Sequence, residues 1–175
     1  MELNTKSIVD FAINAVEKFL EGNPDLTFYA FAFDCNVEDA EINLCLNTEK
    51  GFSETLAMYQ AGKYADQYQT AERIQDVKYN TGDWTYQCFD TFYVLSEEEL
   101  TSKFNEIYPN GVDDDYQAWV RFTKELLEEF TKSLTIFSET NTFKKIPKTA
   151  DFQFFCIDHD EELETALERK QQFSE

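Results

Sequence analysis

The sequence predicts an α+β fold, a single domain over residues 1–175 in which several helices pack on an antiparallel or mixed sheet. Three observations favour this class. The length of 175 residues fits one domain. Apolar residues recur at helical spacing in long segments, whereas strand-like runs are few and lie towards the two ends. Aromatic residues make up 16% of the chain, which supplies enough apolar surface for a core.

The first expected elements are a helix and a hairpin. Residues 4–20 place apolar side chains three and four positions apart, and a Gly-Asn-Pro run ends this helix. Residues 26–34 (LTFYAFAFD) are apolar on both faces, as in a central strand. Residues 41–47 (EINLCLN) alternate between apolar and polar, and the polar turn over residues 35–40 should join the two strands as an antiparallel hairpin.

The middle of the chain gives weaker patterns. Ser53 is a suitable cap for a short helix that runs to about residue 60, and residues 61–76 are polar with no clear period. Residues 76–90 combine an Asn-Thr-Gly-Asp turn with an alternating Trp-x-Tyr-x-Cys run. This combination predicts a short strand or an ordered loop.

Helices dominate the remaining part of the predicted structure. Ser96 and the glutamate three residues later form a capping box, which should open a helix ended by Pro-Asn-Gly. Residues 116–137 keep an apolar stripe that should pack on the sheet, and the acids at 113–115 suit the positive end of that helix dipole. The last expected elements are a basic turn over residues 141–149, a strand over 151–158 and a helix over 161–173.

The charge of the chain restricts its partners. Thirty-five acidic residues against fifteen basic ones give a formal net charge of −20 at pH 7. Because this field repels polyanions, we expect no nucleic acid and no anionic membrane surface as a partner. The first twenty residues resemble no signal peptide, and no apolar run is long enough to span a bilayer. These observations favour a cytoplasmic location.

We also expect no metal and no cofactor. The four cysteines are widely spaced without a CxxC pair and His159 is the only imidazole, so a zinc site fits the sequence poorly. The glycine-rich motifs of nucleotide binding and the GxSxG motif of hydrolases are both missing. The cysteines are interpreted as reduced thiols in the core, at Cys35, Cys45, Cys88 and Cys156.

The acidic clusters have a simple interpretation. Residues 97–99, 113–115 and 158–162 match no calcium-loop pattern. Solvation and favourable charges at helix ends explain the first two clusters, and a protein-binding surface is the main alternative. His159 lies within the third cluster and is expected as an exposed side chain at the end of a strand.

Residues 79–90 are the strongest candidate for a functional segment. Tyr and Trp dominate binding hot spots, so an aromatic turn that carries carboxylates fits a recognition surface. The alternative places Trp84 in the core and uses Asp83 to cap a turn. We expect no catalytic residue, and the candidate partner-binding residues are Asp83, Trp84, Tyr86, Asp113, Asp114 and Asp115.

Three motifs in order carry a family resemblance: Phe28–Asp34 (FYAFAFD), Cys45–Glu49 (CLNTE) and Lys78–Tyr86 (KYNTGDWTY). They resemble the bacterial family called domain of unknown function 4303, and the apolar run that ends at Asp160 is similar too. The NTE turn and the DW-x-Y element carry most of the resemblance. The chain departs from it at residues 78–81, where many relatives have a serine-containing turn. The resemblance implies a small cytosolic bacterial protein without an established enzymatic activity, and some members fit immunity proteins beside polymorphic toxins.

Charge and resemblance together favour a binding protein. The most concrete expectation is an immunity protein that binds and neutralises a basic toxin domain, because a strongly acidic inhibitor steers quickly onto a basic target. One alternative is a carboxylate- or metal-dependent enzyme that uses Asp83 or the cluster at residues 158–160. Another is a housekeeping interaction protein. The sequence leaves the oligomeric state open.

Overall fold

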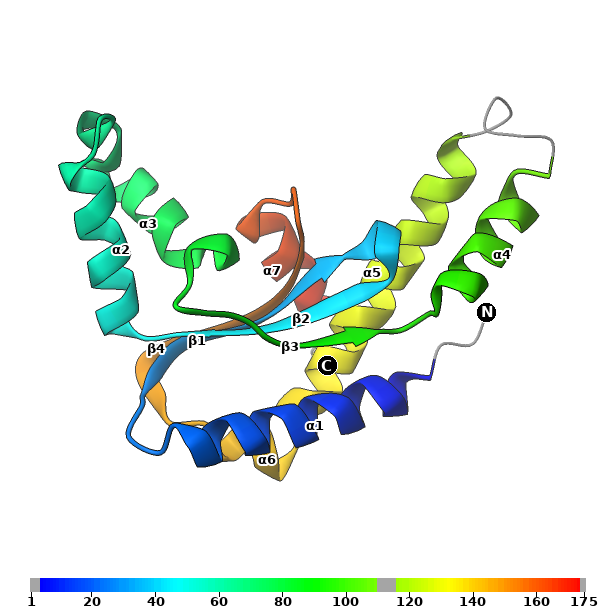
Figure 1. The fold of residues 1–175 in the computed structure, drawn as a ribbon, viewed down its shortest axis with the longest axis horizontal. Helices are drawn as coiled ribbons and strands as arrows, with labels where there is room; N and C mark the ends of the chain where they lie inside the picture. The colour runs from blue at the N-terminus through cyan, green and yellow to red at the C-terminus, as the bar shows by residue number, and fades with distance from the viewer. Residues whose placement is uncertain (1–3, 110–115, 174–175) are drawn as a thin grey trace.

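The computed structural model describes residues 4–109 and 116–173 and shows a four-stranded mixed sheet with helices on both faces (Figure 1). The strand order is β3-β2-β1-β4. β1 and β2 pair antiparallel, β2 and β3 pair antiparallel, and β1 and β4 pair parallel. The predicted α+β class is therefore confirmed. The strands are β1 (Phe28–Asn36), β2 (Glu41–Asn47), β3 (Tyr86–Tyr93) and β4 (Lys148–Asp158).

The helices separate onto the two faces of the sheet. α1 and α6 lie on one face, whereas α2, α3 and α7 rise from the other (Figure 1). The helices are α1 (Thr5–Gly22), α2 (Glu49–Ala61), α3 (Ala71–Tyr79), α4 (Glu97–Ile107), α5 (Tyr116–Ser138), α6 (Asn141–Lys145) and α7 (Leu163–Gln171). The described residues also form short 3₁₀ helices: η1 (Val37–Asp39) between β1 and β2, η2 (Ala65–Tyr68) between α2 and α3, and η3 (Thr81–Asp83) between α3 and β3.

The larger core lies between the sheet and the helices α1, α5 and α6. Phe31 on β1 contacts Phe137 on α5 and Phe143 on α6, with ring centroids 5.5 and 6.1 Å apart. All three rings are buried. Since each large aromatic side chain removes on the order of 150–250 Å² from water, this cluster supplies much of the driving force for folding.

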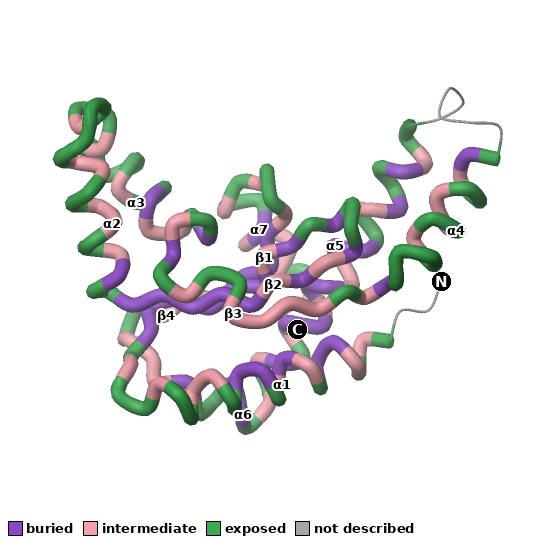
Figure 2. Tube along the Cα trace, in the orientation of Figure 1, coloured by how far each residue is buried: buried purple, intermediate pink, exposed green. Residues whose placement is uncertain are grey.

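A smaller core covers the opposite face of the sheet. It joins Tyr29 and Ala32 of β1 to Phe155 of β4, to Ala166 of α7 and to Trp84, which precedes β3. β1 is therefore buried on both sides, as its continuous apolar run predicts. Figure 2 shows the buried trace running through the middle of the sheet, while the outer turns of α2 alternate between exposed and intermediate residues.

The first half of the chain differs from the expected pattern in the segment after β2. α2 begins at Glu49 instead of Ser53, because Thr48 caps it by accepting a hydrogen bond from the Gly51 N–H at 3.0 Å. Ser53 lies inside the helix and donates to the Glu49 carbonyl at 2.8 Å. Residues 61–76, which have no clear sequence pattern, contain η2 and the start of α3.

The predicted hairpin of β1 and β2 is confirmed. Of the two alternatives for the run after Trp84, the strand is confirmed and extends further than predicted, whereas the segment at residues 141–149 differs from expectation. The run after Trp84 is a complete strand to Tyr93, because β2 offers it a pairing edge that local sequence does not show. The predicted basic turn at residues 141–149 contains α6, capped by Thr140 through the Phe143 N–H at 3.2 Å. The capping box is confirmed, with the Ser96 N–H donating to Glu99 at 2.8 Å.

The cysteines agree with the sequence interpretation in part. All four are free thiols, and Cys35, Cys45 and Cys156 are buried. Cys88 is exposed on β3, so its predicted place in the core is wrong. Within residues 4–109 and 116–173, no helix combines the length and the apolar character needed to cross a bilayer.

Candidate functional site

A cleft of about 490 Å³ opens on the face of the sheet that carries the smaller core. One wall comes from α2, η2, α3 and η3, and the other from the link between β4 and α7 (Figure 1). Its polar and aromatic lining includes Tyr59, Tyr68, Arg73, Asp76, Asn80, Thr81, Asp83, Asp158, His159, Glu161 and Glu162.

Asp83 is held in one orientation on the first wall. Its Oδ1 accepts a hydrogen bond from the Tyr59 hydroxyl at 2.8 Å, and its Oδ2 accepts one from Asn80 Nδ2 at 2.8 Å. The hydrogen bond to Asp83 needs the phenol proton and therefore raises the pKa of Tyr59 to about 12. The Tyr59 ring in turn stacks on Tyr68, with centroids 4.6 Å apart. A carboxylate thus lies beside a stacked aromatic pair.

Lys78 connects this wall to α2, β1 and β4 through its side chain. Its ammonium group pairs with Glu49 at 3.0 Å and with Asp151 at 3.3 Å, and lies 4.7 Å from the centre of the Tyr29 ring. Its carbonyl accepts a hydrogen bond from the Tyr29 hydroxyl, which itself accepts one from Asn47 at 3.0 Å. α3 is therefore connected to α2 and β4 by several polar contacts at once.

The second wall is fixed by its own hydrogen bonds. Asp158 Oδ1 accepts from the Val37 N–H at 3.2 Å, and the Asp158 N–H donates to Glu161 Oε2 at 3.2 Å. Arg169 Nη2 donates to the same Glu161 oxygen at 2.7 Å and to the Cys156 carbonyl at 2.7 Å. The carboxylates of Asp158 and Glu161 are therefore held in place by hydrogen bonds within the protein.

The lining of the cleft is predominantly anionic. Five carboxylates contribute to it, and the basic side chains in the lining are Arg73 and His159. Arg73 pairs with Asp76 at 3.2 Å and so neutralises part of that charge. Carboxylates gathered in a concave site raise the local concentration of cations. The arrangement can therefore hold a cationic group next to the aromatic wall.

The structure separates the candidate residues of the segment 79–90. Asp83 lines the cleft. Trp84 is 3% exposed, donates through Nε1 to the Lys78 carbonyl at 3.0 Å, and packs edge-on against Phe155. The interpretation of Trp84 as an exposed binding residue is therefore wrong, and its alternative, a tryptophan that fills the core, is confirmed.

Tyr86 belongs to neither the cleft nor the smaller core. It is half-buried on β3 and packs against Phe19 and Phe28, with centroids 5.3 and 6.2 Å away, in the larger core. The other three candidates, Asp113, Asp114 and Asp115, lie outside the described residues. Of the six candidates, the structure thus places Asp83 in the cleft and assigns Trp84 and Tyr86 to packing.

Several cleft residues were missed by the sequence interpretation. Tyr59 falls in the short helix predicted to end at about residue 60, and Tyr68 falls in the segment without a clear period, so no pattern indicates that they stack. Asp76 falls in the same uncertain region. His159 is exposed after β4, as expected, but it faces the same cleft as Asp83. The signal available beforehand was the acidic cluster at residues 158–162, which supplies most of the second wall.

The family of the chain follows from a comparison over nearly its whole length. The family model described as Domain of unknown function (DUF4303) matches residues 8–172. The chain belongs to this family. The match includes every residue named in the cleft, and the resemblance seen in the FYAFA, NTE and DW-x-Y motifs is confirmed. Comparisons with curated proteins and with solved structures gave no match.

Proposed function

We propose that this protein is a cytosolic bacterial binding protein whose anionic cleft takes a basic segment of a protein partner. The observation that carries the proposal is the cleft itself, in which five carboxylates lie on a chain of net charge −20. Its most concrete form is an immunity protein that neutralises a basic toxin domain by occupying the toxin's active site.

The net charge supports this proposal through the kinetics of association. A field of one sign attracts an oppositely charged partner and raises the association rate by orders of magnitude at low ionic strength. An inhibitor of a toxin must bind before the toxin acts, so a fast association is useful to the host. The same field keeps nucleic acid away from the inhibitor.

The side chains on the first wall of the cleft support an arginine as the group recognised. A guanidinium is planar, pairs with carboxylates through two parallel hydrogen bonds and stacks on aromatic rings. Asp83 lies beside the stacked rings of Tyr59 and Tyr68 and offers both kinds of contact. Because intramolecular hydrogen bonds already orient Asp83, little side-chain entropy is lost on binding.

The test compares two variants of equal charge as baits in lysate of the host. Asp76→Lys with Glu162→Lys reverses charge inside the cleft, whereas Glu72→Lys with Glu164→Lys makes the same change on the same two helical segments outside it. We expect the wild type and the outer variant to retain one basic protein stoichiometrically, and to retain less at high salt. The cleft variant should lose it. Equal retention by both variants would contradict the role of the cleft.

A carboxylate-based enzyme is the second candidate, and the cleft favours it too. An enzyme of this kind needs carboxylates that converge in a concave site, and Asp83, Asp158 and His159 line one. The same experiment separates the two candidates. If wild-type bait retains nothing at low salt while small cationic compounds raise its melting temperature, and the cleft variant loses that shift, the site serves a small ligand instead of a protein.

A further inference from the structure

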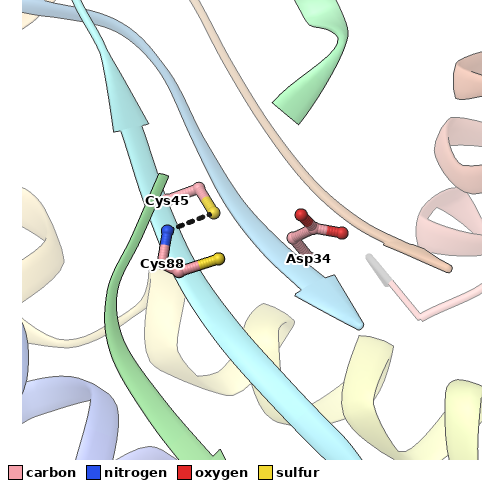
Figure 3. Close-up of side chains that lie close together, drawn as sticks. All are labelled: Asp34, Cys45 and Cys88. Atoms are coloured by element: carbon pink, nitrogen blue, oxygen red, sulfur yellow. Dashed lines mark hydrogen bonds between the residues drawn. The ribbon is translucent and has the colours of Figure 1, made fainter. Parts of the chain in front are cut away.

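Three side chains with metal-binding atoms meet on neighbouring strands outside the cleft. They are Asp34 of β1, Cys45 of β2 and Cys88 of β3, and their carboxylate oxygen and two sulfur atoms all lie within 4.8 Å of one another. Figure 3 shows both sulfur atoms directed towards the side on which Asp34 lies. Within residues 4–109 and 116–173, this is the one group of at least three such ligands.

The register of the sheet explains the first two ligands. Asp34 pairs with Asn43 across the β1–β2 ladder, and Cys45 lies two positions further along β2. Because side chains alternate between the two faces of a strand, Asn43 and Cys45 share the face that carries Asp34. The carboxylate and the first thiol are therefore neighbours on one face of the sheet.

An irregularity in β3 adds the third ligand. Leu44 pairs with Asp90 but Leu46 pairs with Tyr86, so β3 carries extra residues opposite Cys45. Cys88 lies in this bulge with a positive φ of 47°, and its N–H donates to Cys45 Sγ at 3.2 Å. The bulge thus brings the Cys88 thiol next to the Cys45 thiol.

We propose that Asp34, Cys45 and Cys88 form a Zn²⁺ site with one coordination position left for water or a ligand. Two thiolates and one carboxylate are zinc ligands, and three protein ligands with an open fourth position are typical of reactive zinc sites. Sulfur atoms about 2.3 Å from a tetrahedral ion lie about 3.8 Å apart, which is compatible with the observed spacing. Thiolate ligands favour zinc over magnesium or calcium, which prefer oxygen.

The surroundings suit a cation and leave it accessible. Cys88 is exposed, so an ion can reach the site from solvent. Glu41 and Asp158 are near enough for their negative charges to act on Asp34. Thr81 and His159, which line the cleft, also interact with Asp34. The zinc site therefore adjoins the cleft, although it does not depend on the function proposed for the cleft.

A second thiol pair supplies a matched control. Cys35 and Cys156 lie on the opposite face of the sheet with their sulfur atoms 3.5 Å apart. Both are fully buried, and no carboxylate joins them in a group of three ligands among the described residues. Removal of Cys35 therefore removes a thiol without touching the proposed zinc site.

The test is a titration of the reduced, metal-free protein with Zn²⁺ against a chromogenic chelator of micromolar affinity. We expect one ion to bind per chain with release of protons, because thiols must ionise to bind zinc. Co²⁺ in place of Zn²⁺ should give the near-ultraviolet charge-transfer band of thiolate ligands. Cys88→Ser and Asp34→Asn should each lower the affinity for Zn²⁺ by at least about tenfold. Loss of a residue that only hydrogen-bonds to a metal ligand already costs about that much, and loss of a ligand itself should cost no less. Cys35→Ser should bind as the wild type does.

Three results would overturn the proposal. The first is a wild-type protein that does not compete with the chelator. The second is undiminished binding by Cys88→Ser or by Asp34→Asn, with folding of both variants confirmed by circular dichroism. The third is loss of binding in Cys35→Ser alone, which would place the ion at the buried thiol pair instead.

Discussion

Among single residues, Cys88 has the most unusual chemistry. The contact between the two thiol side chains lowers the pKa of Cys88 to about 7. The same side-chain contact, together with burial, raises the pKa of Cys45. Near neutral pH the buried Cys45 therefore keeps its proton, whereas a large fraction of the exposed Cys88 is ionised to the thiolate. Thiolates, not thiols, react with electrophiles, so this arrangement makes Cys88 the reactive cysteine of the chain.

Alkylation of the metal-free protein should show this difference directly. We expect iodoacetamide to modify Cys88 first, at a rate that rises with pH through about pH 7 and then levels off as the thiolate fraction saturates. Peptide mass spectrometry across a pH series measures the rate at each cysteine. In Cys45→Ala the inflection should move up towards about 8.5, the ordinary thiol value. An inflection that stays at pH 7 in that variant would show that Cys45 does not cause the shift.

Because Trp84 is buried, we expect it to matter for stability more than for recognition. Trp84→Phe should lower the free energy of unfolding by about 1–3 kcal/mol, the range of ordinary core substitutions, because the smaller ring leaves space beside Phe155. The Lys78 carbonyl keeps its hydrogen bond from Tyr29, which limits the loss. Urea unfolding measures the change, and binding of the partner should be unaffected.

The matched substitution in the cleft is Tyr59→Phe. It removes only the hydroxyl that bonds to Asp83, so it should change stability little and weaken partner binding. If Trp84→Phe instead abolished binding without changing stability, Trp84 would belong to the interface.

At the scale of elements, the start of α2 depends on a close approach between chain segments. A Cβ atom at Gly51 would lie 2.2 Å from Thr85 Oγ1 and 2.6 Å from Asn47 Oδ1. The Thr85 hydroxyl can rotate away. The Asn47 oxygen cannot move freely, because it accepts hydrogen bonds from the N–H groups of Thr48 and Thr85 at 3.0 and 3.3 Å. Glycine is thus required where α2 meets the start of β3.

Gly51→Ala should therefore destabilise the protein by about 1–3 kcal/mol through overpacking. Helix propensity alone predicts the opposite sign, a gain of about 1 kcal/mol. Gly22→Ala is the control, because a Cβ there meets nothing within 4 Å. Urea unfolding of both variants decides between the two effects. A stabilised Gly51→Ala would show that the close approach does not exist.

The elements also show what local sequence can and cannot predict. The β1–β2 hairpin and the Ser96 capping box were predicted, because the determining residues lie within a few positions of one another. The extent of β3 was not, because its strand conformation depends on pairing with β2 about forty positions earlier. The cleft was not predicted for the same reason, because Tyr59 and Asp158 line it from elements that are far apart in the sequence.

For the whole molecule, the charge should dominate the response to salt. The excess acidic side chains give a net charge of −20 and repel one another in the compact state, and this repulsion opposes folding. We expect the melting temperature to rise when ionic strength increases from about 10 mM to about 150 mM, because the Debye length falls from about 30 to about 8 Å. Differential scanning fluorimetry measures the shift.

The charge-reduced variant with Glu72→Lys and Glu164→Lys is the control for this prediction. Both positions are exposed, so the variant should fold and show a smaller gain with salt than the wild type. A melting temperature that is independent of salt in both proteins would mean that local ion pairs, such as those of Lys78, already compensate the repulsion.

The sequence by itself determined the fold class, the hairpin, the helix capped by Ser96, the acidic character and the family, because each depends on composition or on residues close together along the chain. Only the tertiary structure decided that Trp84 is buried, that Asp83 and His159 line one cleft, and that Cys45 and Cys88 meet Asp34. These are contacts between elements far apart in the chain. They arise from strand register, a bulge and helix packing, which no local pattern encodes.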